Sequence, residues 1–198
     1  MVKKAITIEI IDVKPLTPAC WDDFVTLFGP NGACAGCWCM WFLMTNKEFK
    51  ASHKIGHFEA MRTLVHQGVE PGLIAYADGI PAGWVALAPR ERYERLKTSN
   101  VLAPVDDLPV WSITCFFIHR TYRRAGLMVK LIKAGVEYAG THGARIVEAY
   151  PYESDQKMSA LTIYTGIAST FKKVGFKEVE RRSANRPIMR FVIPGNCF

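Results

Sequence analysis

A short basic turn with one glycine is the part of this 198-residue chain that is best suited to bind an anionic ligand. The turn, residues 123–126, separates a charge-free stretch, Ser112 to Ile118, from a segment with helical periodicity. Backbone N–H groups at the start of a helix have no partner within the helix, and the helix dipole adds partial positive charge there. Two arginines add full charges. We therefore predict that this turn binds a pyrophosphate or similar group.

The elements that position the turn follow from the pattern on either side. Ser112 to Ile118 is rich in aromatic and β-branched residues, which is typical of a buried strand. The helix that follows has two adjacent apolar stripes, made by Leu127, Leu131, Gly135 and Tyr138 and by Met128, Ile132, Val136 and Ala139. Its opposite side is polar. A second apolar strand, Ile146 to Tyr150, completes a strand–turn–helix–strand unit.

The stretch from Trp111 to Tyr150 resembles the acetyl-CoA-binding region of the GNAT superfamily of N-acetyltransferases. The signature of that family is Arg or Gln, two variable residues, Gly, a variable residue, and then Gly or Ala. It corresponds here to Arg123, Arg124, Ala125, Gly126, Leu127 and Met128, so that Met128 departs from the small residue that is usual. Phe171 to Phe176 also resembles the helix end that precedes the final hairpin in the family. The resemblance is strongest over residues 72–193.

The resemblance implies an α/β (α+β) fold of GNAT type, with a mixed, mostly antiparallel central sheet flanked by helices. Residues 1–198 would form one domain, as the chain length also suggests. The implied activity is transfer of an acetyl group from acetyl-CoA directly to a primary amine of a small-molecule or peptide acceptor. The backbone of Phe116, Phe117 and Ile118 would hold the pantetheine arm, and residues 123–128 the pyrophosphate. An alternative is a catalytically degenerate CoA-binding regulatory module.

Two residues are candidates for proton transfer. The amine must lose its proton before it can attack, and the departing thiolate needs a proton or a stabilising field. Many relatives have a Tyr general acid where this chain has Phe171, so Tyr164 is our candidate acid, with Tyr150 as a substitute. Glu148 interrupts an apolar strand and is our candidate base. A structural ion pair between Glu148 and an arginine is an equal alternative.

Cysteines and aromatic residues gather in one further segment. Cys34, Cys37 and Cys39 are close enough in sequence to suggest a metal site, but a fourth ligand would have to be found elsewhere. We predict reduced thiols in a tight loop and no metal site. The resemblance implies that residues 34–44 form one wall of the acceptor site. Its Trp38, Trp41 and Phe42 would suit an apolar or aromatic acceptor, or an amine cation over a ring.

Composition limits the other function classes. The net charge of +7 comes from basic residues spread along the chain rather than from a run, so nucleic-acid binding is a minor interpretation. Phe24 to Asn46 carries no charge, but glycines and Pro30 interrupt it, which argues against a membrane span. We expect a soluble cytoplasmic protein with no signal peptide. The sequence leaves a homodimer open.

The remaining elements follow from capping and periodicity. The predicted strands are Ile6 to Val13, a hairpin of Leu73 to Ala77 and Gly83 to Leu87 around Asp78-Gly79, Phe176 to Glu180, and Ile188 to Ile193. The predicted helices run from Thr17 to Phe28, from a capping box at Thr45 to about Gln67, from Arg90 to Lys97, and from Ser169 to Val174.

Overall fold

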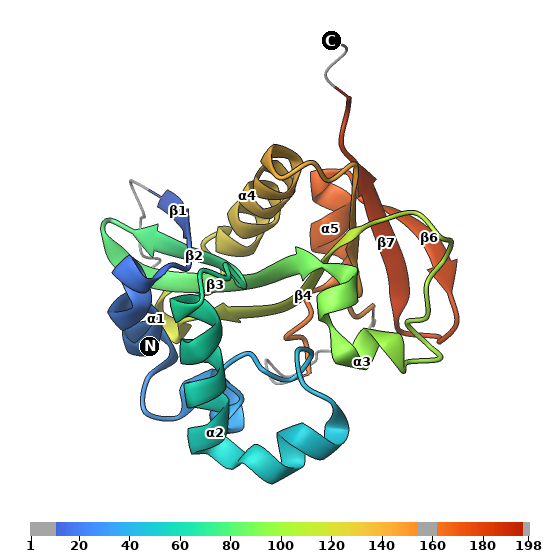
Figure 1. The fold of residues 1–198 in the computed structure, drawn as a ribbon. Coiled ribbons are helices and arrows are strands. Elements are labelled where there is room, and N and C mark those ends of the chain that lie inside the picture. Colours follow the sequence, from blue (N-terminus) through green and yellow to red (C-terminus); the bar gives the residue numbers. More distant parts are fainter. Residues whose placement is uncertain (1–10, 154–161, 196–198) are drawn as a thin grey trace, which may run out of the picture.

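The computed structural model describes residues 11–153 and 162–195 (Figure 1). These residues form a seven-stranded sheet in the order β1-β2-β3-β4-β5-β7-β6. The strands are β1 (Ile11–Pro15), β2 (Gly72–Ala77), β3 (Ile80–Pro89), β4 (Trp111–Ile118), β5 (Ile146–Ala149), β6 (Lys177–Arg181) and β7 (Pro187–Val192). Only β4 and β5 pair in parallel, while the other neighbours are antiparallel. The predicted mixed, mostly antiparallel sheet is therefore confirmed.

Helices cover both faces of the sheet (Figure 1). They are α1 (Trp21–Phe28), α2 (Asn46–His66), α3 (Glu94–Lys97), α4 (Leu127–Thr141) and α5 (Ala168–Val174). The apolar stripe of α4 packs with α5 on one face, around Leu131, Ile113 and Phe171. On the other face, α1 and α2 pack around Trp84 and Phe24. β4 therefore packs between the two cores.

Several element boundaries agree with local signals in the sequence. Thr45 Oγ1 accepts the Glu48 N–H at 3.2 Å, and the Glu48 carboxylate accepts the Thr45 N–H at 2.9 Å, which is the predicted capping box. Asp78 and Gly79 are both left-handed, with φ of 49° and 80°, and they join β2 to β3 as predicted. Part of the predicted first strand, residues 6–10, lies outside the described residues; the described part, β1, continues to Pro15.

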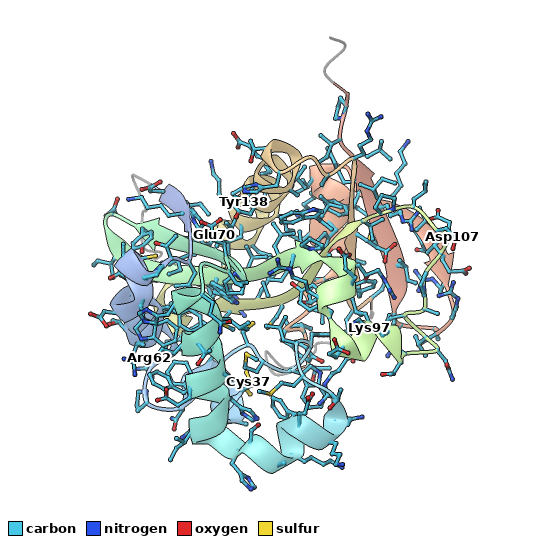
Figure 2. All side chains as sticks on the ribbon, in the orientation of Figure 1. Cys37, Arg62, Glu70, Lys97, Asp107 and Tyr138 are labelled. Carbon is cyan, nitrogen blue, oxygen red and sulfur yellow. The ribbon has the colours of Figure 1, made fainter. Side chains whose placement is uncertain are left out.

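The end of α4 away from the turn is tied to the rest of the sheet. The Tyr138 hydroxyl donates a hydrogen bond to the Glu70 carboxylate, just ahead of β2 (Figure 2). Trp111, the first residue of β4, packs edge-on against the Tyr138 ring at 6.0 Å. The helix that follows the basic turn is thus anchored at its far end as well as along its apolar side.

The strands β4 and β5 separate along their length. They pair only from Trp111 with Val147 to Ile113 with Ala149, where β5 ends. β4 continues to Ile118 with β3 as its only paired strand in this part of the sheet. On the open side, the Phe116 N–H donates instead to the Tyr164 carbonyl at 2.6 Å. The sheet therefore opens beside the end of β4, next to the basic turn.

Candidate functional site

The basic turn has the backbone conformation of an anion-binding helix start. Gly126, immediately before α4, is left-handed with φ 77°, and a Cβ built on it would contact nothing within 4 Å. Glycine is therefore favoured there by conformation rather than by crowding. The N–H groups of residues 125–128 have no hydrogen-bond acceptor among the described residues. Four donors at the positive end of a helix can receive phosphate oxygens.

The side chains of the turn differ in what they can contribute. Arg123 Nε donates to the Ile118 carbonyl at 3.0 Å, which turns this guanidinium toward the end of β4. Arg124 is exposed and left-handed, with φ 69°. Leu127 is buried in the core, so that only its backbone can face a ligand. Met128 is half-buried against the same core, which shows how this position accommodates a long side chain.

The backbone of β4 that we expect to hold a pantetheine arm is partly in use within the chain. The Phe116 N–H bonds to Tyr164, and the Ile118 carbonyl accepts from Arg123. Side chains alternate across the strand, so that Phe116 packs on Phe171 at 5.9 Å on one face. Phe117 packs on Phe28 at 5.4 Å on the other. The role of the backbone of residues 116–118 in donor binding stays a prediction.

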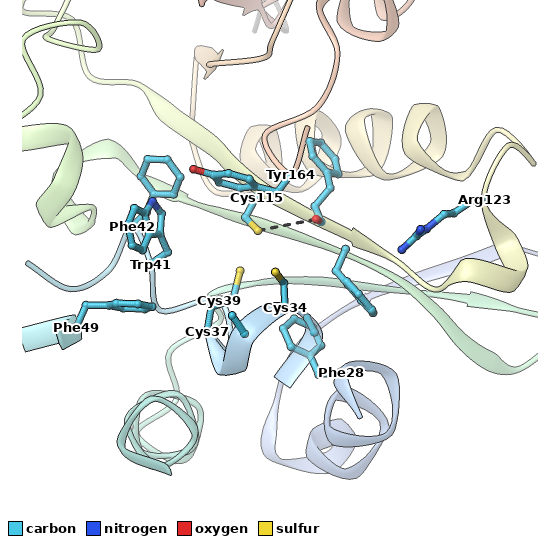
Figure 3. Close-up of a pocket in the computed structure, with 14 residues that line it drawn as sticks. Phe28, Cys34, Cys37, Cys39, Trp41, Phe42, Phe49, Cys115, Arg123 and Tyr164 are labelled. Carbon is cyan, nitrogen blue, oxygen red and sulfur yellow. Dashed lines mark hydrogen bonds between the residues drawn. The ribbon is translucent and has the colours of Figure 1, made fainter. Parts of the chain in front are cut away.

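A cavity of about 370 Å³ lies between β4 and the segment of residues 32–42, which we call the cysteine loop (Figure 3). It is lined by Phe28, Ala33, Cys34, Ala35, Cys37, Cys39, Trp41, Phe42, Phe49, Cys115, Phe116, Phe117, Arg123 and Tyr164. The cavity therefore adjoins both the strand and the arginine of the predicted donor site. Trp41 and Phe42 reach it as the acceptor-wall prediction requires, whereas Trp38 is buried in the core against Phe28 at 5.8 Å.

The cysteine loop has an unusual backbone that tertiary contacts hold in place. Ala33, Ala35, Trp38 and Cys39 are all left-handed, with φ between 44° and 63°. Such conformations cost free energy in non-glycine residues and are found where the surroundings impose them. The two ring nitrogens of His57 in α2 lie 2.9 Å from the carbonyls of Gly36 and Phe49. The Trp84 indole N–H donates to Cys39 Sγ at 3.0 Å.

Three titratable groups of the cavity wall are held in their neutral forms. Burial raises the pKa of Cys37 to about 11. The adjacent Cys39 thiol and burial raise the pKa of Cys115, and burial raises the pKa of Tyr164. In the part of the chain that the structure describes, no group of three His, Cys, Asp or Glu side chains is arranged to hold a metal ion. The His57 ring faces carbonyl oxygens rather than the thiols.

The two tyrosines considered for proton transfer lie in different environments. Tyr164 is half-buried and lines the cavity, next to the bond between its own carbonyl and Phe116. Tyr150 is fully buried away from the cavity, where its hydroxyl donates to Glu148 at 2.6 Å and lies 2.9 Å from the Ser112 hydroxyl. The structure thus brings Tyr164, but not Tyr150, to the predicted site.

Glu148 is part of a buried ion pair. Its side chain is 0% exposed, and its second oxygen accepts from Arg190 Nε at 2.8 Å. Arg190 also bonds both oxygens of Asp106, at 2.6 and 3.0 Å. Glu148 does not line the cavity. This geometry favours the ion-pair interpretation, and a role for Glu148 in proton transfer stays a prediction.

Sequence reasoning missed two aromatic rings of the cavity. Phe28 is the last residue of α1, and Phe49 lies in the first turn of α2. Both were expected to be ordinary helix residues, because helical periodicity gives no information on which helix ends meet. The Phe49 ring is stacked on His57 at 3.9 Å, so the residue that holds the cysteine loop also orients this wall.

Comparison with known proteins identifies the family. The sequence model described as the acetyltransferase (GNAT) family matches residues 38–161, more than half of the chain, and the chain therefore belongs to this family. No curated protein sequence matches the chain. No helix among the described residues combines the length and apolar character needed to cross a membrane.

Solved structures share the fold at low sequence identity. The aminoglycoside N-acetyltransferase AAC(6′)-Iy in complex with CoA has a TM-score of 0.53 and 16% identity, and the match covers 100% of both chains. The NatC complex bound to Gag peptide and CoA has a TM-score of 0.53 and 13% identity, over 94% of this chain and 100% of that one. The PaiA N-acetyltransferase from Thermoplasma acidophilum, in complex with coenzyme A, has a TM-score of 0.51 and 12% identity, over 93% and 100%.

Proposed function

We propose that this member of the GNAT family is an N-acetyltransferase that transfers the acetyl group of acetyl-CoA directly to a primary amine. The observation that carries the proposal is the turn of residues 123–128, which presents four unpaired N–H groups beside the open end of β4. Relatives of the same fold were solved with CoA bound. The cavity that adjoins Phe117 and Arg123 supplies a place for the acceptor.

The turn fits the pyrophosphate of the donor. The N–H groups of residues 125–128 would bind its oxygens, and the open space above Gly126 admits them. Arg124 is exposed and adds charge, while Arg123 would bring its charge to the boundary between turn and cavity. When bound, acetyl-CoA supplies a thioester that an amine can attack. The backbone of residues 116–118 would position it after the Phe116 N–H exchanges its partner.

Proton transfer would involve the cavity rather than the buried ion pair. Tyr164 lines the cavity and its hydroxyl is held neutral by burial, so it could donate a proton to the departing sulfur. Glu148 could act as a base only by giving up its bonds from Tyr150 and Arg190. We therefore propose that Glu148 supports β5 and that Tyr164 is the general acid.

The proposal can be tested by a substitution that fills the turn. Gly126→Asp adds bulk and negative charge where the pyrophosphate would bind, and it should abolish the stabilisation by CoA. In the wild-type protein, ligand at 100 times its dissociation constant should raise the free energy of unfolding by about 2.7 kcal/mol. The matched control is Gly143→Asp, at the other end of α4, because Gly143 is also left-handed, with φ 81°, and also has open space around its Cβ.

Two readouts separate donor binding from turnover. A thermal melt with acetyl-CoA, CoA and inorganic phosphate reports binding, and mass spectrometry of an amine panel reports acetylated products. A thiol reagent would be unsuitable, because the cavity and loop contain free cysteines. Equal stabilisation of wild type and Gly126→Asp by CoA would contradict the proposed donor site. CoA binding with no acetylated product from any amine would favour the degenerate module.

A further inference from the structure

We infer that the acceptor is an aromatic amine, bound as the neutral species in the cavity between β4 and the cysteine loop. This inference rests on the proposed acetyl transfer and adds the chemical class of its acceptor. It follows from three properties of the cavity: its aromatic lining, its size and the signs of the charges around it.

Aromatic rings reach the cavity from several elements. Phe28 comes from α1, Phe49 from α2, and Phe117 from β4. Trp41 and Phe42 come from the cysteine loop, as Figure 3 shows. The volume of about 370 Å³ is near the lower end for small-molecule pockets. Such a cavity has room for a compact ring system beside a thioester, whose flat faces can pack against the surrounding rings.

The charged groups that face the cavity are positive. Arg123 lines it and, in Figure 3, points toward it from the α4 side. The Arg95 guanidinium lies 3.5 Å from the centroid of the Trp41 ring. No Asp, Glu or His side chain is among the described lining residues.

Three carboxylates outside the cavity lining are already paired. Glu148 is bonded to Arg190, and Glu94 lies 2.5 Å from Lys97 Nζ. Glu153 bonds both Lys172 and Arg181. The described residues that line the cavity therefore provide neither a counter-ion for an ammonium group nor an evident base.

An alkyl amine is poorly suited to this environment. With a pKa of ~10, only about one molecule in 1,000 is neutral at pH 7. Its ammonium form would enter an apolar cavity that has arginines at its edge, without a compensating carboxylate. The thiols of Cys37 and Cys115 could not take the proton, because their raised pKa values keep them protonated. The nitrogen of an aromatic amine is already neutral near pH 7.

The transfer to such an amine is balanced without a further reactant. The nitrogen lone pair forms a bond to the thioester carbonyl carbon, and the carbon–sulfur bond breaks. The proton lost by the nitrogen ends on the CoA sulfur, directly or through the Tyr164 hydroxyl. The products are an N-aryl acetamide and CoA with a free thiol.

The test compares aniline with benzylamine, which are similar in size and differ in basicity. We expect kcat/KM for aniline at pH 7 to exceed that for benzylamine at least about tenfold and to change little between pH 6 and 9. The value for benzylamine should rise about tenfold per pH unit over this range, with the fraction of neutral amine. Faster benzylamine turnover at pH 7, or no aniline turnover by a protein that CoA stabilises, would overturn the inference. A protein that CoA does not stabilise would overturn the proposed function instead.

A pair of variants tests the role of charge directly. Cys34 lines the cavity, is exposed and has an extended backbone, with φ −131°. Cys34→Asp adds a carboxylate to the wall, and Cys34→Asn is its neutral control of the same shape. Relative to Asn, the Asp variant should shift the kcat/KM ratio toward benzylamine by about tenfold, since the carboxylate offers a counter-ion and a base. An unchanged ratio in two variants with equal melting temperatures would contradict the electrostatic part of the inference.

Discussion

Replacing Glu148 with Gln would distinguish a structural carboxylate from a catalytic base. The substitution keeps the shape of the side chain but removes its charge. Glu148 accepts from Tyr150 through one oxygen and from Arg190 through the other, at 2.6 and 2.8 Å. A glutamine has only one acceptor oxygen, so its amide N–H₂ group would have to face one of these two donors.

The expected cost follows from burial. Glu148 is 0% and Arg190 8% exposed, so the substitution would leave a buried guanidinium without one of its two carboxylate partners. Breaking a buried ion pair in this way costs about 3–5 kcal/mol. Arg190 retains its bonds to Asp106, which is 39% exposed, and we therefore expect the lower end, about 3 kcal/mol. For a chain of this size that corresponds to a decrease in melting temperature of about 6–12 °C.

The matched control is Glu153→Gln, which removes an exposed ion pair. Glu153 is 38% exposed and bonds Lys172 and Arg181 at the surface. Exposed pairs contribute about 0–1 kcal/mol, so this variant should melt within about 4 °C of the wild type. Thermal denaturation of both variants, followed by circular dichroism, would measure the difference, and a steady-state assay on the same samples would measure kcat and KM.

The ion-pair interpretation would be refuted by a specific combination of results. If Glu148→Gln melts within about 2 °C of the wild type but loses more than about 100-fold in kcat, the carboxylate is a base. Normal stabilisation of that variant by CoA would show that the donor site is intact. Loss of the pH dependence of kcat in the same variant would then identify Glu148 as the group that titrates.

Three further outcomes are expected. Cys37 should react with iodoacetamide about 100-fold more slowly than a free cysteine at pH 8, because burial raises its pKa from 9.0 to about 11. Peptide mapping of a time course would measure the rate, and a rate equal to that of the free thiol would contradict the prediction. Hydrogen bonds from Lys172 and Arg181 lower the pKa of Glu153. This carboxylate therefore stabilises the folded state above its unfolded pKa of about 4.3, and the stabilisation is lost as the pH falls through the lower pKa of the folded state. The melting temperatures of wild type and Glu153→Gln should therefore converge on acidification. His57→Leu should cost about 1–3 kcal/mol in urea denaturation, because it leaves the Gly36 carbonyl of the cysteine loop without its partner. A loss under about 0.5 kcal/mol would show that the ring does not hold the loop.

The sequence predicted elements whose signals are local. The apolar stripes of α4, the capping box at Thr45 and the turn at Asp78 each depend on residues within a few positions of one another. A break in α2 was not predicted, because His53, with φ 52°, lies within an otherwise ordinary helical pattern. The partner of Glu148 was not predictable either. Arg190 is placed opposite it by the antiparallel register of β5 and β7, which no local pattern determines.

The cysteine loop shows the same limit for the candidate site. Its sequence suggested thiols and aromatic rings near an acceptor but not the backbone that presents them. The Gly36 carbonyl faces His57, and the thiol of the left-handed Cys39 accepts from Trp84, so that residues far along the chain contact this backbone. A pattern of cysteines by itself is equally typical of a metal site, and only the surrounding contacts show which groups the thiols face.

The arrangement of charge around β4 connects the two halves of the proposed reaction. The strand ends in a cationic turn, where unpaired N–H groups and Arg124 can balance the anionic charge of a pyrophosphate. A few residues earlier, the same strand borders a cavity in which Cys37, Cys115 and Tyr164 are held neutral. The donor would thus be held mainly through its phosphates, at a distance from the reacting centre. A neutral amine can approach a thioester in such a cavity without first being deprotonated by the protein, whereas an ammonium ion would meet the positive charges of Arg95 and Arg123.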